Sequence, residues 1–177
     1  VKEFMGGVQA VNKKYDTIMI DPINSFQREK GTNSHESDYE TASKLRLYAK
    51  KFNTSIYVCM HASTEALRKV HPNNHDFEGL PIPPSGADAE GGGKWINRCD
   101  DFITVHRYTQ SEMKWMYTQI HVKKVKETET GGMPTFLTAP VEFRLDRGVA
   151  FMCGGINSLE AKEEINNSLN DEANRNF

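Results

Sequence analysis

Two residues that could act on a bound phosphate each follow a short apolar segment. Asp21 comes directly after residues 17–20, and His61 comes directly after residues 55–60. A carboxylate at the end of a buried strand can hold the magnesium ion of a nucleotide, as a Walker B aspartate does. A histidine in such a place can hydrogen-bond a phosphate. Each has an ordinary alternative, because many strands end in Asp and a histidine at a sheet edge can be purely structural.

A group of lysines lies later in the sequence, where residues 105–126 contain five basic side chains and one acidic side chain. Lys124 and Lys126 alternate at the end of an apolar run, and a glycine turn at residues 131–132 follows. Because strand side chains repeat every two residues, both ammonium groups are expected on one face. They could reach an anion bound to a neighbouring subunit. The alternative is a strand face that only contacts solvent.

Three other motifs do not carry the chemistry that they first suggest. The segment Gly91–Trp95 is not a phosphate-binding loop, because Trp follows its lysine where GxxxxGK requires Ser or Thr. His71, His75 and Asp76 lack nearby residues that could complete a zinc site. Cys59 lies within an apolar run with no sign of activation, so a nucleophilic role is not expected.

The elements that must position these residues follow from the apolar periodicity. Residues 17–20 predict a strand buried on both faces, and the capping box at residues 37–40 predicts the start of a helix. The order is strand, helix, strand, then mostly hairpin strands, which predicts an α/β domain with a parallel sheet and a C-terminal antiparallel extension. The further expected elements are a helix end at 1–14, strands at 55–61, 101–107, 116–126, 141–145 and 149–152, short helices at 65–70 and 95–98, and an irregular stretch at 71–93.

Length and composition limit the class of protein. The chain has 177 residues, a net charge of −2 and 37% hydrophobic residues, which suit one ordinary folded domain. No apolar run approaches the roughly 20 residues of a membrane span. The three cysteines show no CxxC spacing, which favours a reducing, cytoplasmic setting. Residues 157–177 hold five acidic and two basic side chains and predict an acidic, polar tail, either helical or disordered.

In their order along the chain, these segments resemble the later two-thirds of the RecA-like ATPase domain of ring-shaped replicative helicases. The likeness is greatest to the Twinkle and phage primase–helicase branch, with the DnaB type nearby. Residues 17–21 resemble its Walker B strand, and residues 45–61 resemble the helix and strand that lead to its phosphate sensor. Residues 91–107 are similar to its glycine segment and the strand after it, and residues 124–132 to its Lys-x-Arg and Thr-Gly segment.

This resemblance implies a RecA-like, mostly parallel sheet in a partial ATPase domain over residues 1–156. It implies an ATP-dependent DNA helicase, of a phage or phage-like source, that uses ATP and Mg²⁺ and forms a homo-oligomer, expected to be a hexameric ring. Asp21 would bind the metal and His61 would sense the phosphate. Lys124 and Lys126 would act in trans on the nucleotide of the adjacent subunit, and Arg107 would line the same interface.

The irregular stretch from His71 to Gly93 would then line a channel that grips single-stranded DNA, with Lys69 and Lys94 as the cations that contact its phosphates. The chain also departs from the family. Lys126 occupies the position of the arginine finger, Gly92 replaces a serine, and the P-loop and catalytic glutamate are missing. Because the chain begins with Val, we expect these parts upstream in a longer protein or on a partner chain, and we expect little ATP hydrolysis without them.

Two alternatives stay open from the sequence. The chain could be a non-catalytic RecA-like module that binds DNA or assembles with another ATPase, which the missing P-loop favours. It could also belong to a RecA-like recombination or repair ATPase, whose nucleotide site would look the same.

Overall fold

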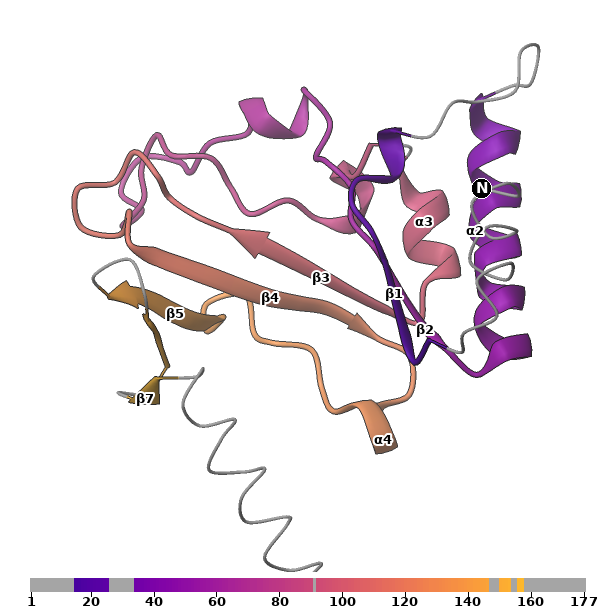
Figure 1. The fold of residues 1–177 in the computed structure, drawn as a ribbon. Coiled ribbons are helices and arrows are strands. Elements are labelled where there is room, and N and C mark those ends of the chain that lie inside the picture. Colours follow the sequence, from indigo (N-terminus) through magenta and orange to yellow (C-terminus); the bar gives the residue numbers. More distant parts are fainter. Residues whose placement is uncertain (1–14, 26–33, 91, 147–149, 154–155, 158–177) are drawn as a thin grey trace, which may run out of the picture. The chain divides into compact units, whose positions relative to one another are not determined.

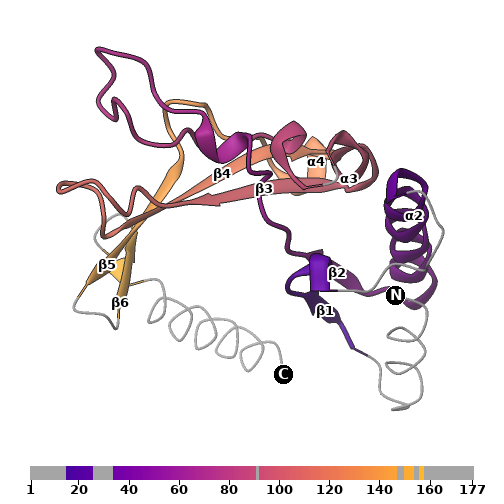
Figure 2. The same cartoon turned by 90° about the horizontal axis from the view of Figure 1, so that it is seen from above.

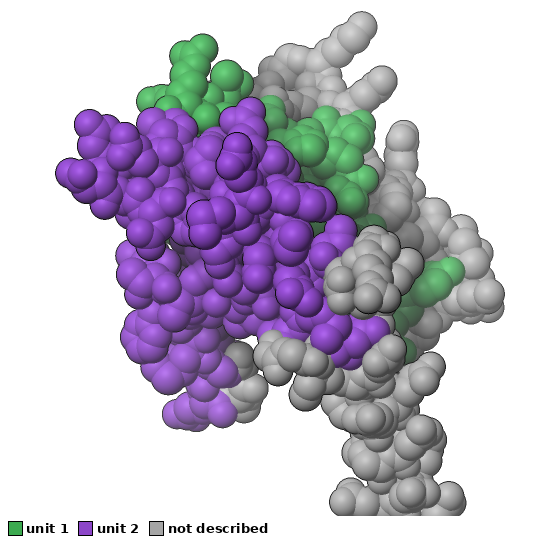
Figure 3. Space-filling model, turned by 90° about the vertical axis from the view of Figure 1, so that its left-hand side faces the viewer, with its two compact units in different colours: residues 1–69, 84–102 green, residues 70–83, 103–177 purple. Residues whose placement is uncertain are grey.

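The computed structural model describes residues 15–25, 34–90, 92–146, 150–153 and 156–157. The helix expected over residues 1–14 and the tail after residue 157 lie outside these ranges. The chain divides into two compact units, shown in Figure 3. Unit 1 is residues 1–69 and 84–102, and unit 2 is residues 70–83 and 103–177. Each unit is described by itself.

Unit 1 contains a two-stranded parallel sheet with a helix in the connection between its strands. The strands are β1 (Thr17–Ile20) and β2 (Ser55–Val58), and the helix is α2 (Ser34–Phe52). Figures 1 and 2 both show β1 beside β2. Shorter helical elements complete the unit: η1 (Ile23–Ser25), η2 (Ala66–Arg68), η3 (Gly86–Asp88) and α3 (Gly93–Arg98). The helices expected at 65–70 and 95–98 are thus present, the first only as a 3₁₀ turn.

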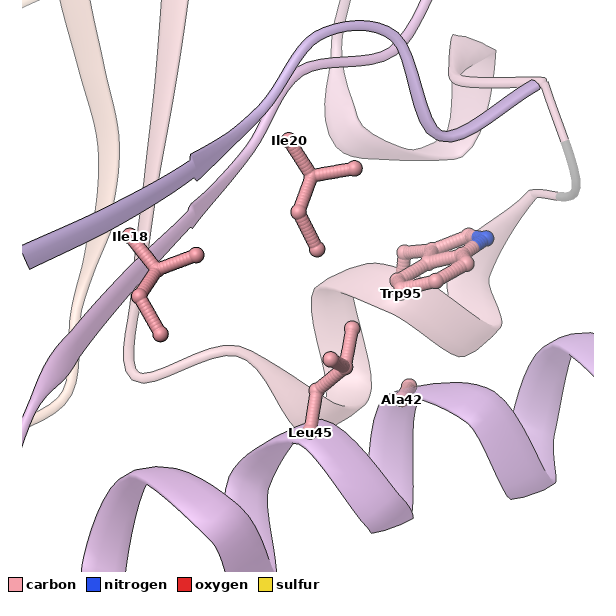
Figure 4. Packing of buried hydrophobic residues seen from close by; sticks show 5 residues of the cluster. All are labelled: Ile18, Ile20, Ala42, Leu45 and Trp95. Atoms are coloured by element: carbon pink, nitrogen blue, oxygen red, sulfur yellow. The ribbon is translucent and has the colours of Figure 1, made fainter. Parts of the chain in front are cut away.

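The core of unit 1 lies between one face of this sheet and the helices (Figure 4). Its buried side chains come from β1, α2 and α3, and they are Ile18, Ile20, Ala42, Leu45 and Trp95. The alternate residues of β1 face the other way, and Met19 is 62% exposed. The prediction that residues 17–20 are buried on both faces is therefore wrong. An apolar run of four residues cannot show how many of its faces are covered.

Helix α2 begins earlier than the sequence predicts. Its first residue is Ser34, so Ser37 lies inside the helix and does not cap it. A Ser-x-x-Glu spacing describes four residues only, and it does not exclude helical backbone before them. Helix α2 ends at Phe52, and the next residue, Asn53, has a positive φ of 47°. Such a left-handed residue stops a helix, and the Thr54 N–H then donates to the Ala49 carbonyl at 3.1 Å.

Unit 2 is built on a five-stranded sheet with the strand order β3–β4–β5–β6–β7. The first two residues of β3, Asp101 and Phe102, are assigned to unit 1. The pairs β4–β5, β5–β6 and β6–β7 are antiparallel, and Figure 1 shows β3 and β4 running in opposite directions. The strand bounds are β3 (Asp101–His106), β4 (Tyr117–Val125), β5 (Val141–Asp146), β6 (Ala150–Cys153) and β7 (Ile156–Asn157), and the short helix α4 is Thr128–Gly131.

The coarse fold class is confirmed, since the described chain mixes α and β structure with both parallel and antiparallel pairing. The four expected strands from residue 101 onward agree with β3 to β6 within one residue at each end. Among the described strands, however, only β1 and β2 pair in parallel, so a mostly parallel sheet is not seen there. Within the same residues, no helix combines the length and the apolar character needed to cross a membrane.

Candidate functional site

Asp21 lies at the carboxyl end of the parallel sheet of unit 1. The register pairs Ile20 with Val58, so Asp21 and Cys59 follow at the same edge. The Cys59 N–H donates to the Ile20 carbonyl at 2.8 Å, and the Ile23 N–H donates to the Cys59 carbonyl at 2.9 Å. Burial raises the pKa of the Cys59 thiol, and the negative charge of Asp21 raises it further. A thiol held protonated in this way is a poor nucleophile, as the sequence predicts.

His61 lies beyond its strand rather than at its end. Strand β2 stops at Val58, and His61 is exposed three positions later. At this point the backbone pairs with the segment that contains Asp88 and Glu90. The Glu90 N–H donates to the His61 carbonyl at 2.9 Å, and the Ser63 N–H donates to the Asp88 carbonyl at 2.8 Å. The expected strand over 55–61 is therefore too long by these three residues. His61 thus follows the strand that pairs with β1, three residues beyond its end.

This pairing brings a second carboxylate to the same region, which sequence reasoning missed. Asn24, in η1 just after Asp21, donates its side-chain amide to the Glu90 carboxylate at 2.5 Å. Glu90 is also joined to His61 through the backbone. The two acidic residues before the glycines, Asp88 and Glu90, are visible in the sequence, but no spacing rule connects either of them with Asn24.

The chemistry open to this edge is that of exposed oxygen and nitrogen ligands. Among the described residues, no three His, Cys, Asp or Glu side chains converge as a metal-binding group. Magnesium differs from zinc in this respect, because it is often held by one or two carboxylates together with substrate phosphates and water. Asp21 is an exposed carboxylate of the kind that can hold such a magnesium ion.

The two lysines expected to contact DNA have different surroundings in unit 1. Lys69 donates its ammonium group to Asp88 at 2.6 Å, an ion pair that raises the pKa of Lys69. The bond from Lys69, followed by those from Ser85, lowers the pKa of Asp88 to about 2. A phosphate would have to compete with Asp88 for this lysine. Lys94 lies in the first turn of α3 and is half-buried.

The cations expected to act in trans belong to unit 2. Lys124 lies in β4, and Lys126 is exposed directly after that strand ends. Arg107 follows the end of β3 and donates to the Trp115 carbonyl at 3.0 Å. Strands β3 and β4 run in opposite directions (Figure 1). Arg107 follows the end of β3 and Lys126 follows the end of β4, so Arg107 and the two lysines lie at opposite ends of this strand pair.

Comparison with models of known protein families gives no match, and a search of curated proteins finds none similar to this chain.

Proposed function

We propose that this chain is part of the RecA-like ATPase domain of an ATP-dependent DNA helicase, from the Walker B strand onward. The observation that carries the proposal is the parallel pairing of β1 with β2, which puts Asp21 and the segment leading to His61 at one carboxyl edge. Open α/β sheets bind their ligands at such edges. A mostly parallel RecA-like sheet would need further strands beside these two, from a preceding segment or a partner chain.

In this proposal each residue acts on a different part of the nucleotide or the DNA. Asp21 holds the magnesium ion of ATP, and His61 hydrogen-bonds the terminal phosphate. Lys124 and Lys126 reach the nucleotide of the next subunit in a homo-oligomeric, hexameric ring. Lys69 and Lys94 bind the phosphates of single-stranded DNA. Lys69 would give up its ion pair with Asp88 when it binds a phosphate. The ring works in the cytoplasm, and the phosphate-binding loop is supplied outside the 177 residues.

A non-catalytic RecA-like module is the second candidate, and the cation after β4 favours it. Lys126 is a point charge that cannot form the two parallel hydrogen bonds of a guanidinium with a phosphate. Such a module would assemble with an ATPase or bind DNA without turnover. A recombination or repair ATPase would use the same residues as a helicase, so strand separation is the assay that distinguishes those two.

The test compares two aspartates at opposite ends of β1 in the full-length protein that contains this chain. Asp21→Asn removes the carboxylate at the carboxyl edge, and Asp16→Asn removes an exposed one just before the strand. We expect Asp21→Asn to lower DNA-stimulated ATP hydrolysis by about a hundredfold or more, and Asp16→Asn to leave it near the wild-type rate. Lys126→Ala should lower it too, and mixing with wild-type subunits should restore part of the activity.

Wild-type turnover in both Asp21→Asn and Lys126→Ala would overturn the assignment of the site. A wild-type protein that binds single-stranded DNA but hydrolyses no nucleotide would instead support the non-catalytic module.

A further inference from the structure

A cluster of histidine and aromatic rings holds the 70–83 segment of unit 2 against the end of β3. The rings of His71 and His75 stack with centroids 4.0 Å apart, and Phe77 stacks on Tyr108 at 4.1 Å. His71 Nε2 lies 3.0 Å from the Tyr108 hydroxyl, and His106 meets the Tyr108 ring edge-on at 4.6 Å. These five residues, His71, His75, Phe77, His106 and Tyr108, are called the histidine clasp below.

The 70–83 segment is itself closed by backbone hydrogen bonds. Val70 and Pro81 form an antiparallel bridge, and the His71 N–H donates to the Leu80 carbonyl at 2.9 Å. The Gly79 N–H returns to the His71 carbonyl at 3.1 Å. The segment is therefore a closed loop whose two ends meet, and the clasp connects this loop with the end of β3.

One hydrogen bond of the clasp requires a neutral imidazole. The Phe77 N–H donates to Nδ1 of His75 at 3.1 Å, so this nitrogen must keep its lone pair. A protonated His75 has no lone pair to accept that bond. The neighbouring ring of His71 lies parallel at an interplanar angle of 16°, so a charge on both rings would place two cations in contact. Burial and the proximity of His75 both lower the pKa of His71.

His106 adds a buried nitrogen that a proton would leave without an acceptor. Its ring hydrogen-bonds the backbone of Pro81, which connects β3 to the loop a second time. Its Nε2 atom is buried and has no partner among the described residues. A proton on Nε2 would create a buried N–H donor with nothing to accept it. The pKa of His106 is lowered to about 4, chiefly by burial. His121, His71 and Lys123 act in the same direction, while the hydrogen bond to Pro81 opposes them.

The charged groups that face the clasp come from β4 and β5. Lys123 lowers the pKa values of His106 and His121, so it disfavours their cations. Glu142 raises the pKa values of His121 and Tyr108, but its carboxylate is already engaged by Lys114 and by Gln119. Within the loop, the Glu78 carboxylate accepts the Asn74 N–H at 3.0 Å. Glu142 and Glu78 thus have other partners, and Asp76, between His75 and Phe77, is exposed to solvent.

We propose that the histidine clasp is an acid-sensitive switch, which holds the 70–83 loop on β3 at neutral pH and releases it when its imidazoles become protonated. The switch would act in the same way whether or not the chain is part of a helicase. Release is expected as the pH falls from about 6.5 towards 4, because free imidazole is protonated in this window while the closed clasp resists protonation.

Hydrogen exchange of the wild-type 177-residue chain tests the switch. Backbone protection of peptides covering residues 70–83 is measured at about pH 7.5 and about pH 5, after correction for the intrinsic exchange rate. We expect protection to fall by about tenfold or more at the lower pH, since one unit of pKa difference corresponds to a tenfold change. Unchanged corrected protection would overturn the proposal.

The double variant His71→Gln with His75→Asn removes both stacked titratable rings. Asn at position 75 can still accept an N–H from two residues on, as in an Asx turn, so the loop keeps this hydrogen bond. Because this variant retains His106, we expect its protection to change less between the two pH values than that of the wild type, while a smaller response persists. His61→Gln changes an exposed histidine of unit 1 and should keep the full wild-type response. A double variant that also keeps the full response would contradict the proposal.

If the double variant does not form the closed 70–83 loop, NMR titration of the histidine rings in the wild-type protein tests the switch instead. Ring pKa values below 6.5 for His71 and His106 would support the switch, and values at or above 6.5 would overturn it.

Discussion

At the scale of single residues, Asp88 has the most connected side chain near the candidate site. One of its oxygens accepts from the Lys69 ammonium group at 2.6 Å. The other accepts from the Ser85 N–H at 2.8 Å and from the Ser85 hydroxyl at 2.6 Å, which caps η3. All three bonds favour the charged carboxylate, which is why the pKa of Asp88 falls to about 2.

We therefore expect Asp88→Asn to lower the free energy of unfolding by about 1 kcal/mol at neutral pH. The wild-type carboxylate contributes its full stability above its ordinary pKa of 3.8, and this contribution is lost as the pH falls towards 2. The variant should lack that pH dependence. Urea unfolding at several pH values measures both effects, with Asp16→Asn as the control. Equal pH dependence in wild type and Asp88→Asn would contradict the assignment.

At the scale of elements, β1 shows how one strand divides its side chains between a core and an open face. Ile18 and Ile20 point into the core with α2 and α3 (Figure 4). Met19, between them in the strand, is 62% exposed. Met19 pairs in register with Tyr57 of β2, which is 57% exposed. The two large apolar side chains thus share the open face of the parallel sheet.

This division predicts very different costs for two neighbouring substitutions in β1. Ile20→Ala should lower the free energy of unfolding by about 2–4 kcal/mol, because it removes buried methyl groups and leaves a cavity. Met19→Ala should cost less than about 0.5–1 kcal/mol, since its side chain is mostly in solvent. Urea denaturation followed by the fluorescence of the buried Trp95 measures both. Similar costs for the two variants would show that the open face is packed in solution.

At the scale of the whole molecule, the two units differ in the groups that respond to acid. Unit 2 contains His71, His106 and His121, whose pKa values are all lowered, chiefly by burial. A histidine whose pKa is lower in the folded than in the unfolded protein contributes its full stability above the unfolded pKa of 6.5. This contribution is lost as the pH falls towards the pKa of the folded protein. In unit 1 the lowered pKa of Asp88 acts only below 3.8.

Acid should therefore loosen unit 2 before unit 1. Between about pH 6.5 and pH 4 we expect His106 to cost unit 2 about 1–2 kcal/mol, a value reduced for its partial exposure to solvent. Stepwise hydrogen exchange across this range should show peptides from β3 to β5 losing protection while those from β1, α2 and β2 keep theirs. Simultaneous loss in both units would contradict this order.

The sequence predicts the elements well where local periodicity is sufficient. The strands from residue 101 onward agree with the expected bounds because alternation and turn residues are local signals. It also placed Asp21 directly after β1. The start of α2 and the end of β2 were not recovered, because a capping motif or an apolar run does not show where the backbone changes partner.

Contacts between residues that are distant in sequence become visible only in the folded chain. Asn24 and Glu90 are far apart in sequence, and so are His71 and Tyr108, yet each pair is joined by a hydrogen bond. The sequence showed His71 and His75 as a weak metal motif, whereas the structure stacks their rings. It also separated Arg107 from Lys126, since the hairpin between β3 and β4 reverses the chain. Such contacts depend on long-range pairing and burial, which local spacing does not encode.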